Sequence, residues 1–396
     1  METIQTSSAQ NGEETPSKSP WMAIFMLSVG SFIFINTEFL PIGMLSDIAK
    51  FYGINVGRAG LMVTIPGIAA AISALLLTRF LGRANRKSIL LSLTGLLLLS
   101  NLTIAISPNF ELALFGRLLL GIGVGGFWAF AVPYGINIVR DNHKGRATTI
   151  ITAGIAAGTV AGVPLGTFLG AQLGWQNAFL LNAGLSAVIF IMQLITLPSL
   201  RGESALNFAD MVRVVMEKSV AKRLVSTFTF AAAHFCAFTY FELILTRQAG
   251  LRQELLPAMF LLYGCTGFVG TFVAEFFVKR LTAKNSFRLA TITLLFAVFL
   301  MLFASVSFVA AVGLTLLWGL AYGIMPVSIN IWLYEANEKE YVVSTASNSA
   351  LYQVAVAAGS FAGGIAFNNS GIPATIALSV AIGLVCYGVS FIKTDR

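Results

Sequence analysis

The fold is decided by residues 21–45, which read WMAIFMLSVGSFIFINTEFLPIGML. A helix of roughly 20 apolar residues, rising about 1.5 Å per residue, crosses a bilayer, and this stretch is long enough to do so. It nevertheless carries one carboxylate, Glu38, in its second half. Because a charge inside the membrane costs about 2.5–3.5 kcal/mol on insertion scales, Glu38 is a candidate functional residue.

The composition places the whole chain in a membrane. Of its 396 residues, 57% are hydrophobic and only 11% are charged, and the mean hydropathy is +0.82. A soluble domain carries about twice as many charges. The net charge of +8 comes from short basic clusters between apolar runs, which argues against a nucleic-acid partner and for membrane topology.

Apolar runs of spanning length predict an all-α integral membrane protein with twelve transmembrane helices. The predicted spans are 21–45, 56–79, 88–107, 110–139, 147–172, 176–198, 223–246, 255–278, 287–306, 308–334, 342–367 and 372–392. Lys and Arg concentrate in every second connection, whereas the others hold Lys50, Arg58, Arg247 and Arg252. By the positive-inside rule, both termini are expected in the cytoplasm.

The chain divides into two similar halves. Residues 1–20 are polar and are expected to form a disordered cytoplasmic tail, and the charged segment 199–222 separates the halves 21–198 and 223–396 as a cytoplasmic linker. At an offset of about 200 residues, Glu38 and its neighbours align with Glu242 and its neighbours. Parallel repeats of six helices are typical of secondary transporters, which bind their substrate between the halves near mid-membrane.

Four ionisable side chains inside spans are candidates for proton coupling: Glu38, Arg117, His234 and Glu242. A buried carboxylate can bind a proton on one side of the membrane and release it on the other, and histidine titrates near neutral pH. The alternatives are hydrogen-bonded, static glutamates, a histidine that only packs in the interior, and an arginine that snorkels outward.

Aromatic and amide side chains are candidates for a substrate cavity, because stacking and a few hydrogen bonds suit a small amphipathic or hydroxylated ligand. They are Asn36, Trp128, Asn137, Tyr240, Trp318, Tyr322, Asn330, Trp332, Asn348 and Gln353. Trp and Tyr also serve as interfacial anchors. A nucleotide-binding loop, a spaced metal cluster and a hydrolase nucleophile motif are absent from the sequence, so we expect no enzyme activity, cofactor or metal.

Two motifs carry a resemblance to the major facilitator superfamily, and within it to the twelve-span drug:proton antiporter branch. Arg117-Leu118-Leu119-Leu120-Gly121-Ile122-Gly123 resembles the fourth-helix R-x-x-x-G-x-G signature, whose arginine the family associates with proton transfer. The fifth span resembles the antiporter signature, associated with export, at Gly158, Gly162, Pro164 and Gly166. These residues are expected to be structural, since repeated glycines permit close helix contact.

Within that branch the chain is similar to bacterial sugar efflux transporters, through Asn36 to Gly43 and through His234, Tyr240 and Glu242. The resemblance implies proton-coupled efflux of small sugars or sugar-like solutes by a multi-pass protein, expected to be a monomer, in the bacterial inner membrane. Purine nucleoside exporters and chloramphenicol-type drug exporters share much of the first stretch, so efflux of these compounds is the alternative. A non-transporting membrane sensor is the alternative of another class.

Overall fold

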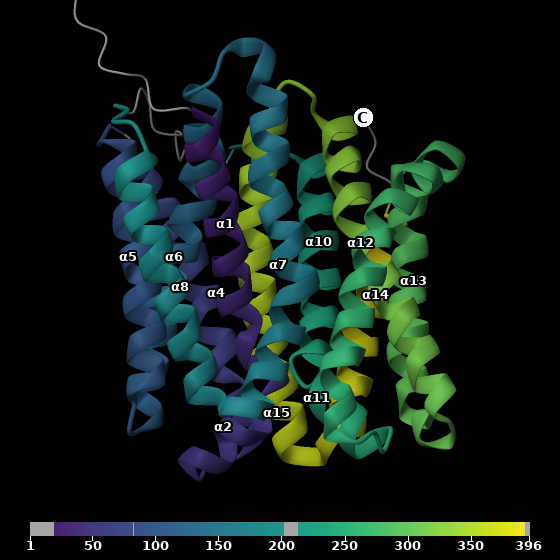
Figure 1. Cartoon of the computed structure of the whole chain (residues 1–396). Helices are drawn as coiled ribbons and strands as arrows, with labels where there is room; N and C mark the ends of the chain where they lie inside the picture. Colours follow the sequence, from purple (N-terminus) through teal and green to yellow (C-terminus); the bar gives the residue numbers. More distant parts are fainter. Residues whose placement is uncertain (1–19, 82, 202–212, 393–396) are drawn as a thin grey trace, which may run out of the picture.

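The computed structural model describes residues 20–81, 83–201 and 213–392, and within these ranges the chain forms helices and no β-strand. The long helices stand side by side as a bundle (Figure 1). Helix α1 begins, and helix α15 ends, at the face drawn at the top of Figure 1, which we name the terminal face. The face with α2 (Leu45–Tyr52), at the bottom of the same view, is the opposite face.

The first six predicted spans are six long helices: α1 (Pro20–Phe39), α4 (Leu61–Leu81), α5 (Arg86–Ala105), α6 (Phe110–Asn137), α7 (Lys144–Leu173) and α8 (Trp175–Thr196). Short segments connect them: η1 (Leu40–Gly43), α2, α3 (Val56–Ala59) and η2 (Asp141–His143). The side chains of Asn55, Asn85 and Asn109 accept backbone N–H groups at the starts of α3, α5 and α6. These N-caps fix where the helices begin.

The later spans are built from α10 (Lys218–Phe238), α11 (Phe241–Leu243), η3 (Ile244–Gln248), η4 (Gln253–Leu255), α12 (Leu256–Leu281), α13 (Ala283–Leu300), η5 (Met301–Val306), α14 (Phe308–Ala336) and α15 (Tyr341–Val389). The predicted seventh span, 223–246, is not one unbroken helix. It bends by 50° between α10 and the segment Phe241–Gln248. At the break, the Tyr240 hydroxyl donates to the Ser360 carbonyl at 3.2 Å and the Tyr240 ring stacks on Phe367.

Helix α15 contains two spans. Its apolar part, Val343–Val389, would be about 70 Å long as a straight helix, more than twice the hydrocarbon core of a bilayer. Gly371, with φ 74° and ψ −162°, interrupts it, and the Thr375 hydroxyl lies 3.4 Å from the Gly363 carbonyl, twelve residues earlier. Only a chain that turns back can bring these atoms together.

The described residues contain ten helices long and apolar enough to cross a membrane, or eleven if the bent pair around Tyr240 is one span. Counting the two arms of α15 separately gives the twelve predicted spans. The prediction of an all-α membrane protein is therefore confirmed.

The helices pack in two groups. One contains α1 and α4 to α8, and the other contains α10 and α12 to α15; α4 against α15 and α7 against α12 join them. The proposed tail, 1–20, lies outside the described residues except for Pro20, and so does 202–212 of the proposed linker. The residue boundaries of the halves stay predictions.

The glycines of the fifth-span motif hold α7 against α1. A Cβ atom on Gly158 would lie 2.9 Å from the Phe32 carbonyl oxygen, and one on Gly162 would lie 3.0 Å from the Asn36 Cα. On Gly166 it would lie only 2.0 Å from the Leu40 side chain. No larger side chain fits at these positions without separating the helices.

Candidate functional site

Arg117 of α6 is fully buried and bonds to main-chain carbonyl groups. Its Nη1 donates to the Thr37 oxygen at 2.8 Å and its Nη2 to the Glu38 oxygen at 2.6 Å, both in the last turn of α1. Its Nε donates to the carbonyl of Met62 in α4. An arginine buried in the membrane is stabilised by such bonds.

Two prolines explain why Arg117 finds these carbonyls unpaired. In an α-helix, a carbonyl accepts the N–H of the residue four positions later, and proline has no N–H. Pro41 follows Thr37 by four residues, and Pro66 follows Met62 by four residues. Arg117 thus replaces two hydrogen bonds that prolines remove, and its charge stabilises the negative end of the α1 dipole.

The Glu38 carboxyl group lies between the two groups of helices. Only 3% of the residue is exposed, and among the described residues its Oε2 has no hydrogen-bond partner. The Gln353 side chain of α15 lies within hydrogen-bonding reach, and Tyr322 and Tyr352 are near enough for electrostatic interaction. Arg117 bonds to the Glu38 main chain, and no ion pair between the two side chains occurs in the described part of the chain.

His234 of α10 is fixed in one tautomer by its two neighbours. The Trp318 indole N–H donates to Nδ1 at 3.0 Å, and indole nitrogen is only a donor, so Nδ1 must be unprotonated. The remaining nitrogen, Nε2, lies 3.4 Å from the Tyr263 hydroxyl, which can accept its proton. A second proton on His234 would break the bond to Trp318.

His234 belongs to an aromatic cluster, which we define as Phe235, Phe238, Tyr263, Trp318, Tyr322 and Tyr352 together with His234. The His234 ring stacks on Tyr322 at 4.2 Å and on Phe238 at 4.8 Å between ring centroids. The Tyr322 and Tyr352 hydroxyls are 2.5 Å apart. This hydrogen bond joins α14 to α15 next to Glu38.

Sequence reasoning did not single out Tyr263, Tyr352 or Phe235. The sequence did contain a signal for the two tyrosines. Each carries a hydroxyl group within an apolar span, and a buried hydroxyl needs a hydrogen-bond partner. Phe235 also stacks on Phe39 of α1, with the ring centroids 5.6 Å apart, so the aromatic cluster reaches the first group of helices.

Asn36 points away from Glu38, because residues two positions apart on a helix are about 200° apart around its axis. Its Nδ2 donates to Asn182 Oδ1 of α8 at 2.9 Å. Nearby, the Asn101 amide donates to the Thr37 hydroxyl at 3.3 Å. These residues form a polar network within the first group of helices, and it supports the turn of α1 that carries Glu38.

Glu242 lies near the opposite face, where it contacts the start of α2. The backbone N–H of Ser46 donates to Glu242 Oε2 at 3.3 Å, a favourable arrangement because a helix N-terminus attracts negative charge. Close by, the Gly57 N–H donates to Asn368 Oδ1 at 3.1 Å, and the Ser360 hydroxyl donates to the Gly60 carbonyl at 3.2 Å. All three hydrogen bonds join the two groups of helices.

The other predicted cavity residues are spread along the bundle. Trp128 is half-buried beside Phe127 in α6, and the exposed Asn137 is the last residue of that helix. Asn330 of α14 is half-buried. Of the predicted cavity set, Trp318, Tyr322 and Gln353 lie at the aromatic cluster or at Glu38. In the described ranges, no three His, Cys, Asp or Glu side chains could hold a metal ion.

The family model described as Major Facilitator Superfamily matches residues 27–363, which is most of the chain. The chain belongs to the major facilitator superfamily. Solved structures of transporters agree with this major facilitator fold. A bacterial homologue of the human lysosomal transporter Spinster, in an inward-facing and unoccupied conformation, gives a TM-score of 0.77 at 13% identity, covering 96% of this chain and 97% of that one. The nucleoside transporter NupG gives 0.74 at 14% identity, covering 94% and 100%.

Among curated relatives, this major facilitator chain is similar to proteins named purine ribonucleoside efflux pump NepI. The protein from Escherichia coli O1:K1 is 28% identical over 374 residues, which cover 94% of each chain. The protein from Salmonella paratyphi B is 30% identical over 366 residues, which cover 92% of each chain. The names of these relatives agree with the alternative of nucleoside efflux better than with the sugar efflux that the sequence motifs favoured.

Proposed function

We propose that the protein exports purine ribonucleosides, or closely similar solutes, in exchange for protons by alternating access. The substrate class comes from its similarity, along nearly the full length, to pumps named for purine ribonucleoside efflux. The single structural observation that carries the mechanism is the Glu38 carboxyl group, which lies between the two groups of helices with one oxygen unpartnered in the described chain.

Glu38 is proposed to carry the exchanged proton. A carboxylate without an ion-pair partner is costly in a membrane interior, and protonation removes that cost. The loss or gain of the proton therefore changes the relative free energies of the arrangements that expose Glu38 to either side. Arg117 keeps the turn of α1 that holds Glu38 in place, and its charge lies near enough to stabilise the deprotonated form.

The aromatic cluster beside Glu38 suits a ligand with an aromatic ring. Purine bases stack on aromatic side chains, and the hydroxyl and amide groups of Tyr322, Tyr352 and Gln353 offer hydrogen bonds to a ribose. A free sugar has no aromatic ring of its own to stack face to face with these side chains. This difference supports the nucleoside proposal over sugar efflux. In this proposal His234 provides a polar contact within the aromatic cluster. Glu242 holds the two groups of helices together at the opposite face.

We further propose that the terminal face is cytoplasmic and that the protein functions as a monomer in a bacterial inner membrane. The clusters of Lys and Arg in the connections on the side of the termini support this orientation. The three hydrogen bonds near Glu242, Asn368 and Ser360 would then close the outer side of the transporter.

Transport by proteoliposomes containing the purified, full-length protein tests the proposal. With a pH gradient imposed, labelled inosine should move against its concentration gradient, and competing adenosine should reduce this movement more than arabinose or chloramphenicol does. Glu38→Gln should abolish proton-driven accumulation while exchange of inosine for inosine persists. Accumulation at the wild-type rate in Glu38→Gln would contradict the coupling role, and competition by arabinose alone would restore the sugar hypothesis.

A further inference from the structure

One face of α15 carries polar side chains at positions 340, 344, 348 and 352, each one helical turn from the next. The residues are Glu340, Ser344, Asn348 and Tyr352, and Ser347 lies beside them. Residues four apart share one side of an α-helix, so these groups form a continuous row. The row runs from the terminal face, where α15 begins, to the Tyr322–Tyr352 hydrogen bond near Glu38.

The three serine and asparagine side chains in the middle of this row are buried and have polar atoms without partners among the described residues. Ser344 is fully buried, Ser347 is 6% exposed and Asn348 is 9% exposed. The hydroxyls of Ser344 and Ser347 and the Oδ1 of Asn348 have no hydrogen bond there, and neither does the Oε1 of Gln353, five residues beyond Asn348.

Many hydroxyls in the helices bond to a carbonyl three or four residues earlier, as Ser349 does with Thr345 on the same helix. The hydroxyls of Ser344 and Ser347 make no such bond, a property they share with Ser100 and Thr345. Buried oxygens that make no bond to protein are satisfied by water or by a ligand. The row is therefore a candidate for a hydrated path.

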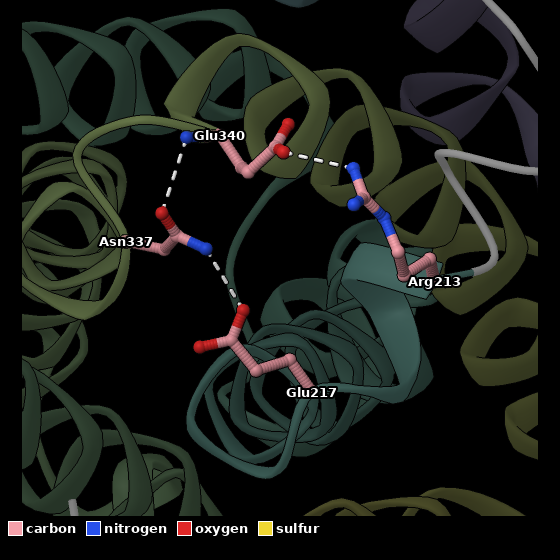
Figure 2. Close-up of polar contacts among 4 residues, drawn as sticks. All are labelled: Arg213, Glu217, Asn337 and Glu340. Carbon is pink, nitrogen blue, oxygen red and sulfur yellow. Dashed lines mark hydrogen bonds and ion pairs between the residues drawn. The ribbon is translucent and has the colours of Figure 1, made fainter.

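A cavity lies at the terminal end of the row. It has a volume of about 360 Å³ and is lined by Arg213, Val214, Met216, Glu217, Asn337 and Glu340. Figure 2 shows the polar contacts around it: Glu340 pairs with Arg213 at 2.9 Å, and the Asn337 amide donates to Glu217 at 2.8 Å. The cavity thus places two carboxylates at the mouth of the row.

We propose that this face of α15 conducts the proton between Glu38 and the terminal face, an assignment that rests on the proposed antiport. The Glu38 carboxylic acid releases its proton from Oε2 to a water molecule, which passes a proton along the row to bulk water at the cavity, leaving Glu38 as the carboxylate. The groups that face Glu38 are Arg117 from α6, Tyr322 from α14, and Tyr352 and Gln353 from α15. Of these groups, only Tyr352 belongs to the row, and Gln353 is the next residue of the same helix.

The decisive test follows the protonation of Glu38 directly, without a substrate. After a pH jump on the reconstituted full-length protein, infrared spectroscopy records the carbonyl stretch of the protonated carboxyl group, assigned to Glu38 by its loss in Glu38→Gln. Asn348→Leu, which keeps the side-chain size but removes the polar atoms, should slow deprotonation about tenfold, since it interrupts a chain of hydrogen bonds. Ser349→Ala, an exposed change on the same helix, is the matched control and should leave the rate unchanged.

The transport assays separate this proposal from the proposed function. Asn348→Leu should slow inosine transport driven by a pH gradient while inosine exchange at equal pH keeps its wild-type rate. An unchanged deprotonation rate would overturn the proposal, and so would an equal loss of exchange, which would make the row part of the substrate path. If Asn348→Leu does not fold, the double variant Ser344→Ala/Ser347→Ala takes its place with the same expected result. A wild-type protein that moves no inosine would refute the nucleoside proposal alone, because the infrared measurement still tests the row.

Discussion

Arg117→Lys tests whether this residue acts through main-chain carbonyls. Lysine keeps the positive charge, but its single ammonium group lacks the planar fork that reaches the oxygens of Thr37, Glu38 and Met62. We expect it to lose one or two of the three hydrogen bonds. At about 1.5–3 kcal/mol for each hydrogen bond to a charged group, the free energy of unfolding should fall by about 1.5–6 kcal/mol.

The prolines supply the control that distinguishes this explanation from a general effect of the buried charge. Pro66→Ala restores an N–H that can bond to the Met62 carbonyl within α4. Arg117→Lys should therefore cost about 1 kcal/mol less in the Pro66→Ala background than in the wild type. Arg58→Lys, at an exposed ion pair with Glu111, should change stability by less than about 1 kcal/mol.

Unfolding of the purified protein in detergent, followed by tryptophan fluorescence as denaturant is added, measures these differences. The carbonyl explanation predicts non-additive costs for the changes at positions 66 and 117. The reasoning would be refuted if Arg117→Lys lowered the free energy of unfolding equally in the wild type and in the Pro66→Ala variant. It would also be refuted if Arg117→Lys did not change the free energy of unfolding at all.

Three further predictions follow from the packing. Gly158→Leu should separate α7 from α1 and sharply reduce the yield of folded protein measured by size-exclusion chromatography, whereas Gly184→Ala, where an added Cβ meets nothing within 4 Å, should not. Trp318→Phe should leave the Nδ1 of His234 without its donor, lower stability by about 1–3 kcal/mol and change the tautomer seen by nitrogen NMR. Glu242→Gln should weaken the contact with the start of α2 by about 0.3–1 kcal/mol, so spin-label distances across the opposite face should shift toward a more open distribution. An unaltered distribution would argue against a fastening role for Glu242.

Much of the candidate site could be predicted from the sequence because its residues are anomalies in apolar runs. Glu38, Arg117, His234 and Trp318 were all identified in this way, and the structure places them at or next to the centre of the bundle. The two prolines carried a signal that sequence reasoning did not use. A proline inside a span identifies, four residues earlier, the carbonyl that an unexplained buried cation can satisfy.

Other parts of the site depended on contacts between helices. Asn36 and Glu38 are two residues apart in one motif, yet they face opposite sides of α1, one toward Asn182 and the other toward Gln353. The predicted seventh span is broken where Tyr240 packs against Ser360 and Phe367 of α15, although its own sequence contains no proline or glycine there. Neither outcome follows from local sequence, since both depend on which surface lies opposite.

The sequence alone determined the membrane class, the number of spans and the close contact along the glycines of α7. Hydropathy, chain length and side-chain size are properties of each segment, and the bilayer allows few structures to such segments. Only the tertiary structure decided that Arg117 bonds to main-chain carbonyls, that an aromatic cluster surrounds His234, and that a row of unpartnered polar atoms on α15 leads toward Glu38. These features arise between helices distant in sequence, whose relative rotation and depth are set by packing rather than by composition.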